Sequence, residues 1–203
     1  MHLFDNLDSG NGYKVRLLLA QLGLEYRWTN LDTDAGATRT PEFLERNPNG
    51  RIPTLELDDG TNLAESNAIL WYLAEGAPFV PGDRLGRAQT LQWMFFEQYS
   101  HEPYVATPRY IVKHLPAGHA RRAELPERLA KGRAALEVMD GHLTTRSFFV
   151  AERYTIADIS LYAYTHVAEE GGHDLEPYAN VRRWLDRVAK QPKHVRIYER
   201  PAG

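Results

Sequence analysis

The sequence predicts an α+β protein of two domains, a small domain of strands and helices followed by an all-α domain. Over residues 1–76, apolar residues follow strand and helix periodicities in the order strand, helix, strand, helix, strand, strand, helix. Residues 76–86 then contain two prolines and three glycines, a composition typical of a linker. The patterns beyond it are helical. We therefore expect domains at residues 1–76 and 87–203, joined by a linker at residues 77–86.

The first domain can be followed element by element. A short strand at 2–5 precedes a helix over 12–22, which places Val15, Leu18 and Leu22 on one face and stops at Gly23. The remaining expected elements are a strand at 25–31, a helix at 41–46, a hairpin of strands 54–57 and 61–63 around Asp58, Asp59 and Gly60, and a helix at 65–75. A strand followed by a crossover helix predicts parallel pairing at the start of the sheet.

The second domain is expected to hold helices near 84–114, 119–143, 155–170 and 178–190. Pro103 and Pro108 should bend or break the first of these, because proline cannot donate a helix hydrogen bond. Thr155 followed by Asp158 forms a capping-box pattern at the start of the third. Loss of such a cap costs about 1 kcal/mol, so we interpret this pair as structural.

Composition excludes several classes of function. The 203 residues have a net charge of −3, and their Lys and Arg residues form no block, so a nucleic-acid partner is not expected. Cysteine is absent, which excludes a protein thiol as nucleophile, redox centre or zinc ligand. The N-terminus lacks signal-peptide features and no run is long enough to span a membrane, so we expect a cytoplasmic protein. The histidines are scattered without metal-ligand spacing, and we expect no metal.

The string SGNGYK at residues 9–14 joins the first strand to the first helix. Taken alone, Ser9 and Asn11 are more simply explained as turn and N-cap residues. The same geometry would also serve chemistry. A hydroxyl, an amide and exposed backbone N–H groups at a helix N-terminus stabilise an anion such as a thiolate.

Two further features admit a structural and a functional interpretation. Pro53 suits the first residue of a strand, and only about 5 to 6% of X-Pro bonds are cis, but a cis bond would turn the Ile52 backbone outward to pair with an extended peptide. Ser66 is a good N-cap residue and Glu65 favours the positive helix end. Alternatively, Glu65 would bind an ammonium group while Ser66 and the helix amides bind a carboxylate.

Together these motifs resemble the glutathione transferase family over nearly the whole chain. NPNGRIPTLEL followed by LAESNAILWYLAE is similar to the glutathione-binding module of the family, and RYTIADISLYAY and LEPYANVRRWLDRVAKQP are similar to helices of its second domain. The resemblance implies a thioredoxin-like N-terminal domain, an all-α C-terminal domain and a homodimer. It also implies that Pro53 is the cis-proline, that Ile52 pairs with the cysteinyl backbone, and that Glu65 and Ser66 bind the γ-glutamyl end.

The same resemblance suggests which residues contact the glutathione thiol. SGNGYK resembles the Nu-class string threonine-proline-asparagine-glycine-histidine-lysine, which implies that Ser9 and Asn11 contact the sulfur, as the serine classes would also imply for Ser9. It departs from that string at Ser9, Gly10 and Tyr13. Arg39 and Arg51 are the candidates for binding the glycine carboxylate. The second-substrate candidates, chosen by their position near the expected helix bend, are Tyr99, His101, Tyr104 and Arg109.

We therefore expect a glutathione transferase with a detoxifying role, in which glutathione is a co-substrate and its thiolate attacks small electrophiles. Lowering a thiol pKa from about 8.5 to near 6.5 requires roughly 2.7 kcal/mol. One charge-assisted hydrogen bond of roughly 1.5 to 3 kcal/mol, with about 0.3 to 1 kcal/mol from the helix dipole, supplies that without a general base. The alternatives are a Nu-class disulfide or peroxide reductase that uses glutathione, and a glutathione-binding interaction protein without turnover.

Overall fold

The computed structural model describes residues 1–201 and divides into two compact units. The first consists of residues 1–77 together with the segment from Pro192, and the second of residues 78–191. The division differs from the expected domains at 1–76 and 87–203 at both boundaries, because residues 78–86 of the expected linker belong to the second unit. The chain after residue 191 belongs to the first unit and not to the helical one.

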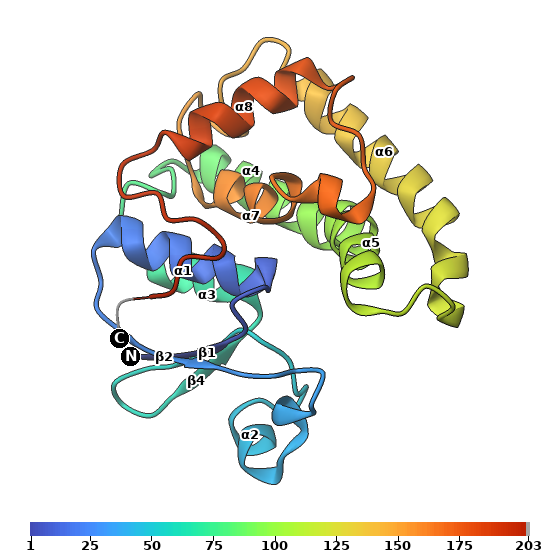
Figure 1. Ribbon diagram of the computed structural model, residues 1–203. Helices are drawn as coiled ribbons and strands as arrows, with labels where there is room; N and C mark the ends of the chain where they lie inside the picture. The colour runs from blue at the N-terminus through green and yellow to red at the C-terminus, as the bar shows by residue number, and fades with distance from the viewer. Residues whose placement is uncertain (202–203) are drawn as a thin grey trace. The chain divides into compact units, whose positions relative to one another are not determined.

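The first unit follows the predicted order of elements, which are drawn in Figure 1. They are β1 (His2–Asp5), α1 (Gly10–Leu22), β2 (Arg27–Asn30), the 3-10 turn η1 (Ala37–Arg39), α2 (Pro41–Arg46), β3 (Thr54–Glu56), β4 (Asn62–Ala64) and α3 (Ser66–Leu73). Gly23 ends α1 in the left-handed conformation, at φ 70°, as its place after the last periodic residue predicts.

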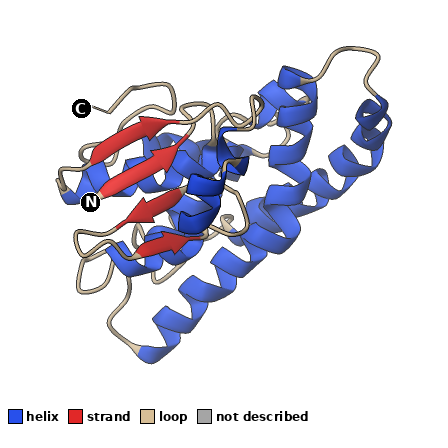
Figure 2. Ribbon diagram, turned by 90° about the horizontal axis from the view of Figure 1, so that it is seen from below, coloured by secondary structure: helices blue, strands red, loops and turns tan. Residues whose placement is uncertain are grey.

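The four strands form one mixed sheet in the order β2-β1-β3-β4 (Figure 2). β1 pairs with β2 in parallel, with Leu3 beside Trp28, so the predicted crossover pairing is confirmed. β1 and β3 are antiparallel, and β3 and β4 form the expected hairpin. β1 is paired with a strand on each side, so its C-terminal end, from which the next loop leaves, is held in place.

The core of the first unit lies between this sheet and two helices. Figure 1 shows α1 and α3 side by side on one face of the sheet and α2 on the other side. The core cluster is fully buried and draws two residues from the sheet and three from α1 and α3: Leu3, Leu55, Val15, Leu19 and Ile69. This packing brings the first turns of α1 and α3 together, which is where the predicted site residues lie.

The second unit is helical, as predicted. Its elements are α4 (Arg84–Phe96), the π-helical turn η2 (Glu97–His101), α5 (Glu102–His114), the 3-10 turn η3 (Ala120–Glu124), α6 (Leu125–His142), α7 (Ile156–Thr165), the 3-10 turn η4 (Ala168–Gly171) and α8 (Ala179–Ala189). The helix α4 begins inside the expected linker 77–86, because Asp83 caps it by accepting from the Gly86 amide at 2.8 Å. The expected helix break falls at η2, just before Pro103, while Pro108 lies within α5 without ending it.

The capping box of α7 is present and its acidic member is buried. The Asp158 carboxylate accepts from the backbone N–H of Thr155 at 2.9 Å and of Phe149 at 3.2 Å, and from Trp184 Nε1 at 2.9 Å. Burial raises the pKa of Asp158 to about 6, against the opposing effect of these donors. The structure thus confirms the predicted capping box of Thr155 and Asp158 and gives Asp158 structural contacts within the helical unit.

The C-terminal segment, residues 192–201, is attached to α1 by hydrogen bonds. Tyr13 donates its hydroxyl to the Val195 carbonyl at 2.7 Å, and Arg16 Nη1 donates to the Ile197 carbonyl at 2.8 Å. Ile197 is 3% exposed. The boundary at 191 was missed because this contact joins residues about 180 positions apart, which helical periodicity in one segment cannot reveal.

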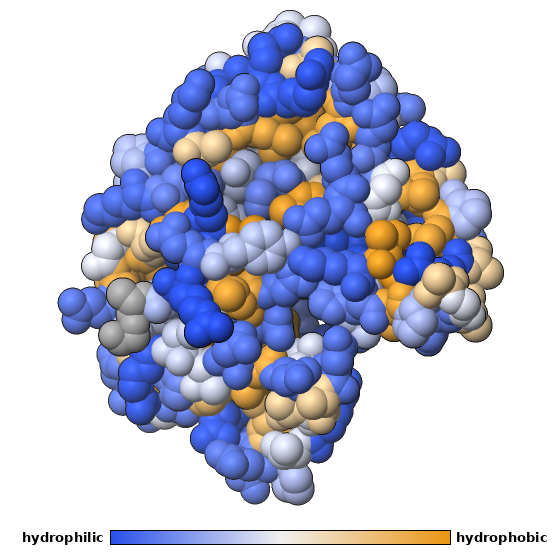
Figure 3. Space-filling view, in the orientation of Figure 1, coloured by the Kyte–Doolittle hydropathy of each residue, from blue (hydrophilic) through white to orange (hydrophobic). Residues whose placement is uncertain are grey.

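Polar and charged residues cover most of the face shown in Figure 3, with smaller apolar patches between them. Within residues 1–201, no helix combines the length and the apolar composition that crossing a bilayer would require.

Candidate glutathione-binding site

The first turn of α1 presents a hydroxyl and an amide side chain. Ser9 is the N-cap, and its Oγ accepts from the Gly12 amide at 3.2 Å. A hydroxyl that accepts one N–H can still donate its own proton to an anion. Residues 10–13, the first turn, contain no acidic side chain, and the Asp5 carboxylate that packs against Gly12 is paired with Arg16. The positive end of the helix is therefore not neutralised by an acid of its own first turn. This arrangement suits a bound anion at the helix start.

Asn11 and Ser66 meet across the two helices, as the core packing predicts. Ser66 Oγ donates to Asn11 Oδ1 at 3.1 Å, and Lys14 Nζ donates to Ser66 Oγ at 3.3 Å. Lys14 is fully buried and Ser66 is 5% exposed. The residues proposed for the thiol and for the γ-glutamyl end therefore belong to one hydrogen-bonded cluster.

Lys14 is a site residue that the sequence reasoning missed. It is the last residue of the SGNGYK string and lies three positions after Asn11, so helical spacing places the two side chains on one face. That spacing was the available signal. A buried ammonium beside Ser66 adds positive charge to the two helix N-termini, and this favours a negatively charged ligand.

At the start of α3, the N-cap is Glu65 rather than Ser66. Glu65 has φ 67° and ψ 112°, its side chain makes no capping hydrogen bond, and it is exposed. Ser66 is the first helical residue, which corrects the structural interpretation of Ser66 as N-cap. A non-glycine residue at positive φ costs about 1 to 3 kcal/mol, and such residues are concentrated at ligand-binding sites. The conformation leaves the Glu65 carboxylate available to a ligand.

The Ile52–Pro53 peptide bond is cis, as the resemblance implies. The strand β3 begins at Thr54, so Ile52 lies just before the ladder. Asn47, which the sequence reasoning also missed, holds this loop: its Nδ2 donates to the Arg51 carbonyl at 2.8 Å and to Thr54 Oγ1 at 3.1 Å. The Ile52 backbone therefore has a fixed position from which an extended peptide could pair.

The two arginine candidates lie at the edge of this loop. Arg39 is the last residue of the η1 turn, is exposed, and donates through Nη1 to the Asn49 carbonyl at 3.1 Å. Arg51 is exposed immediately before Ile52. Arg51 adjoins the peptide-pairing segment directly, and Arg39 is held to the loop that contains it by the bond to Asn49.

The second-substrate candidates, by contrast, do not form a cluster within the helical unit. Tyr99 is 84% exposed, whereas His101 is fully buried with Nε2 at 2.9 Å from Thr165 Oγ1. Arg109 is 4% exposed and forms an ion pair with Glu170 at 2.8 Å, and the Tyr104 carbonyl contacts His173 Nε2 at 2.9 Å. His101 and Arg109 are therefore engaged in contacts within the helical unit, and the second-substrate role of the four residues stays a prediction.

A buried ion pair lies next to the first turn of α1. Asp5, the last residue of β1, accepts from the Asn6 amide at 2.6 Å and from Arg16 Nε at 2.9 Å. Burial raises the pKa of Asp5 to about 6, and the charge of Arg16 opposes that rise. A Cβ atom at position 12 would collide with the Asp5 carboxylate, so only glycine fits there.

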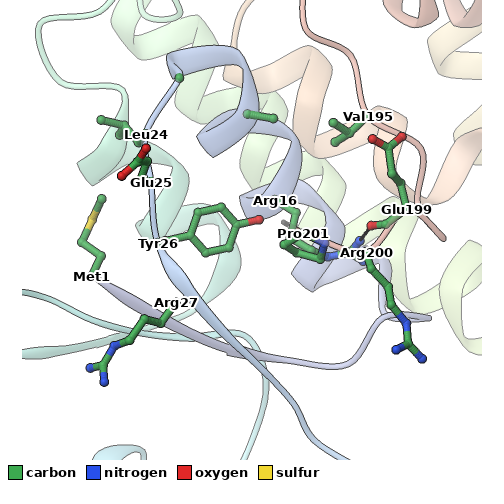
Figure 4. Close-up of a pocket in the computed structure, with 12 residues that line it drawn as sticks. Met1, Arg16, Leu24, Glu25, Tyr26, Arg27, Val195, Glu199, Arg200 and Pro201 are labelled. Atoms are coloured by element: carbon green, nitrogen blue, oxygen red, sulfur yellow. Dashed lines mark hydrogen bonds between the residues drawn. The ribbon is translucent and has the colours of Figure 1, made fainter. Parts of the chain in front are cut away.

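A cavity of about 840 Å³ lies beside α1 in the first unit (Figure 4). Its lining comes from the end of α1, the segment leading into β2 and the C-terminal segment, and includes Arg16, Tyr26, Val195 and Glu199. None of the residues predicted to bind glutathione lines it. The predicted site residues lie instead at the starts of α1 and α3 and in the loop before Pro53. In residues 1–201, no group of three or more acidic, histidine or cysteine side chains is placed to hold a metal ion.

Comparison with known proteins identifies the family. The Glutathione S-transferase N-terminal domain matches residues 1–75, and the Glutathione S-transferase C-terminal domain matches residues 92–192. A crystal structure of glutathione S-transferase from Pseudomonas fluorescens is 49% identical, with 98% of each chain covered and a TM-score of 0.94.

Other relatives differ in their described activities. Disulfide-bond oxidoreductase YfcG of Escherichia coli is 30% identical over 90% of this chain and 87% of its own length. A glutathione transferase structure from Burkholderia graminis, with two glutathione molecules bound per subunit, is 28% identical, with 99% of this chain and 88% of that one covered and a TM-score of 0.85.

Some curated relatives are considerably longer than this chain. The chain spans 65% of Protein URE2 from Eremothecium gossypii, at 29% identity, and 36% of Elongation factor 1-gamma-B from Xenopus laevis, at 33% identity. Since the two domain families together match most of the chain, in the order and at the positions of the two units, this protein belongs to the glutathione transferase family.

Proposed function

We propose that this protein binds glutathione at the starts of α1 and α3 and uses its thiolate as a nucleophile toward small electrophiles. The observation that carries the proposal is the hydrogen-bonded chain from Asn11 through Ser66 to Lys14. It joins the residues assigned to the thiol and to the γ-glutamyl group in one positively charged cluster. Glutathione carries a carboxylate at each end, and this negative charge is complementary to the positive charge of the cluster.

In the proposed complex each part of the tripeptide has a partner. Ser9 donates its hydroxyl proton to the sulfur, and Asn11 orients its amide toward the same atom. The Ile52 backbone pairs with the cysteinyl residue, Glu65 binds the ammonium group, and Ser66 binds the α-carboxylate. Arg39 or Arg51 binds the glycine carboxylate. The protein thus supplies orientation and thiolate stabilisation.

In conjugation, the thiolate attacks an electrophilic carbon, a carbon–sulfur bond forms, and a leaving group such as chloride departs. The direct test is an assay with a chloronitrobenzene and glutathione, using Ser9→Ala as the catalytic control. Turnover that depends on glutathione and falls in Ser9→Ala is expected. Turnover equal in both proteins would remove Ser9 from its proposed role.

Disulfide reduction is the second candidate, favoured by the similarity to YfcG and to a structure with two bound glutathione molecules. The first thiolate attacks a substrate disulfide, releases one thiol and forms a mixed disulfide. A second glutathione then attacks that bond, which yields oxidised glutathione and the second thiol. Parallel assays with the chloronitrobenzene and a small mixed disulfide distinguish the two reactions by their relative rates.

A glutathione-binding role without turnover is the third candidate, because relatives include URE2 and elongation factor 1-gamma proteins. Retention on immobilised glutathione, combined with an unshifted thiol titration and no turnover in either assay, would favour it.

We further propose that the protein is a homodimer. On α4 and the adjoining turn, Phe95 is 65% exposed and Tyr99 is 84% exposed, four residues apart. Adjacent exposed aromatic residues of this kind are typical of interfaces. Light scattering should give a dimer mass for the wild type and a smaller mass for Phe95→Ser combined with Tyr99→Ser.

A further inference from the structure

Arg16 connects three parts of the first unit that are distant in sequence. Its Nε donates to Asp5 Oδ2 at 2.9 Å, and its Nη2 donates to the Leu7 carbonyl at 2.8 Å. Its Nη1 donates to the carbonyls of Ile197 at 2.8 Å and Glu199 at 3.4 Å. The side chain is 1% exposed. One guanidinium group thus fixes the end of β1, the loop that leads to Ser9, and the C-terminal segment.

Two routes lead from this guanidinium to the thiol-binding residue. The Leu7 carbonyl lies two residues before Ser9 in the same loop. The Asp5 carboxylate packs directly against Gly12, whose amide donates to Ser9 Oγ. A shift of Arg16 would therefore displace both the backbone before Ser9 and the amide that orients its hydroxyl.

The C-terminal segment is hydrogen-bonded to two residues of α1, Tyr13 and Arg16, through the carbonyl groups of every second residue. Tyr13 binds the carbonyl of Val195, and Arg16 binds those of Ile197 and Glu199. The 840 Å³ cavity separates part of this segment from the end of α1. Figure 4 shows Val195, Glu199 and Arg200 along one side of that cavity and Arg16 between them and Tyr26. Attachment of the segment therefore depends on these hydrogen bonds and on the buried Ile197 side chain, more than on continuous packing.

From this arrangement we infer that Arg16 is a positioning residue, through which the C-terminal segment holds Ser9 in the geometry that stabilises the glutathione thiolate. The inference rests on the proposed function. It assigns a role in thiol activation to residues 192–201, none of which belongs to the predicted glutathione site. Arg16 also offsets the negative charge of Asp5 next to the first turn of α1, where an uncompensated carboxylate would oppose a thiolate.

The test uses full-length variants and the ultraviolet titration of the thiolate in the glutathione complex. Arg16→Lys keeps a positive charge beside Asp5 but cannot serve all four acceptors. Tyr13→Phe combined with Ile197→Ala loosens the C-terminal segment and leaves Arg16 intact. We expect both variants to raise the thiol pKa by about half a unit or more and to lower kcat, with KM for glutathione unchanged.

Two controls separate positioning from loss of stability. Leu73→Ala trims the same hydrophobic core at the far end of α3 and should lower the melting temperature without moving the thiol titration. Arg196→Gln changes an exposed residue of the C-terminal segment and should titrate like the wild type. If the other variants do not fold, the thiol is titrated in Tyr13→Phe alone, which removes a single oxygen atom.

The possible results are distinct. A thiol pKa that is lowered in the wild type and equally lowered in Arg16→Lys and in the Tyr13/Ile197 variants would overturn this inference and leave the proposed function standing. A wild-type complex whose thiol titrates like free glutathione would overturn the proposed function, and the inference with it.

Discussion

The starts of α1 and α7 are both helix N-termini with a hydroxyl residue at the N-cap, yet they serve different purposes. At α7, Asp158 turns back onto the first turn and accepts from the Thr155 and Phe149 amides and from Trp184. At α1, Ser9 accepts from Gly12, and residues 10–13 offer no carboxylate. The start of α7, whose first turn contains its own unpaired acid, is a closed helix start. The start of α1 is an open one, because its first turn contains no acid and the Asp5 carboxylate beside Gly12 is paired with Arg16.

The comparison extends to the start of α3, which resembles α1 more than α7. Glu65 carries a carboxylate but does not cap its helix, and its backbone is held at positive φ. Ser66 and Lys14 then join α3 to α1. The acid at this helix start is exposed and makes no capping hydrogen bond, which supports our proposal that it meets an ammonium group.

The largest expected effect comes from opening the closed helix start. Asp158→Ala leaves four donors without their acceptor in the core of the helical unit, because the Thr155 hydroxyl also donates to this carboxylate. We expect it to lower the free energy of unfolding by about 3 to 5 kcal/mol. Urea denaturation measures this. Asp186→Ala, an exposed acid on α8, is the matched control and should change stability by less than about 0.5 kcal/mol. A small loss in Asp158→Ala would contradict the structural role assigned to the capping box.

The pH dependence of stability gives the next effect. Burial raises the pKa of Asp158 to about 6, above its ordinary value of 3.8, so between these values the folded state binds more protons than the unfolded state. The contribution of Asp158 to stability is therefore complete below pH 3.8, its unfolded pKa, and is lost as the pH rises through its folded pKa of about 6. This loss is about 2 to 3 kcal/mol.

Comparison of the wild type with Asp158→Asn isolates that group, because Asp5 and the histidines titrate alike in both proteins. From pH 4 to pH 7, the free energy of unfolding of the wild type should fall relative to that of Asp158→Asn. A difference that does not vary with pH over this window would show that the folded pKa of Asp158 is not raised.

At the open helix start, Ser9→Ala removes the hydroxyl proposed to donate to the sulfur. We expect the thiol pKa to rise by about 1 to 2 units, which corresponds to a charge-assisted hydrogen bond of about 1.5 to 3 kcal/mol. Turnover should fall and glutathione affinity should change little. Ser9→Thr keeps the hydroxyl and is the control. If Ser9→Ala titrates like the wild type, Asn11→Ala becomes the next variant to measure.

The smallest effect concerns the backbone at Glu65. Glu65→Gly and Glu65→Ala both remove the carboxylate, so each should weaken glutathione binding, measured by calorimetry. Only glycine relieves the positive φ, and Glu65→Gly should be about 1 kcal/mol more stable than Glu65→Ala. Equal stability of the two variants would mean that the backbone of Glu65 is not strained.

The elements and the capping box could be predicted from the sequence because both depend on residues close together in the chain. The sequence predicted each strand and α-helix of the first unit, though not the 3-10 turn η1, and the spacing of Thr155 and Asp158 predicted a bond that the structure contains. Ser9 was likewise predictable as an N-cap from its place between strand and helix.

The contacts that join distant residues were not predictable in this way. Lys14 meets Ser66 across 52 positions, and Arg16 meets Ile197 across 181. Periodicity shows which face of a helix is buried but not what it is buried against. The exposure of the second-substrate candidates was not predictable either, since a place near a proline says nothing about whether a side chain such as His101 is buried.

The ultraviolet titration of glutathione bound to the wild-type protein tests the central claim most directly. If Ser9, Asn11 and the open end of α1 stabilise a thiolate, the bound thiol should ionise roughly two units below its ordinary value of about 8.5. A bound thiol that ionises at the same pH as free glutathione would contradict the account.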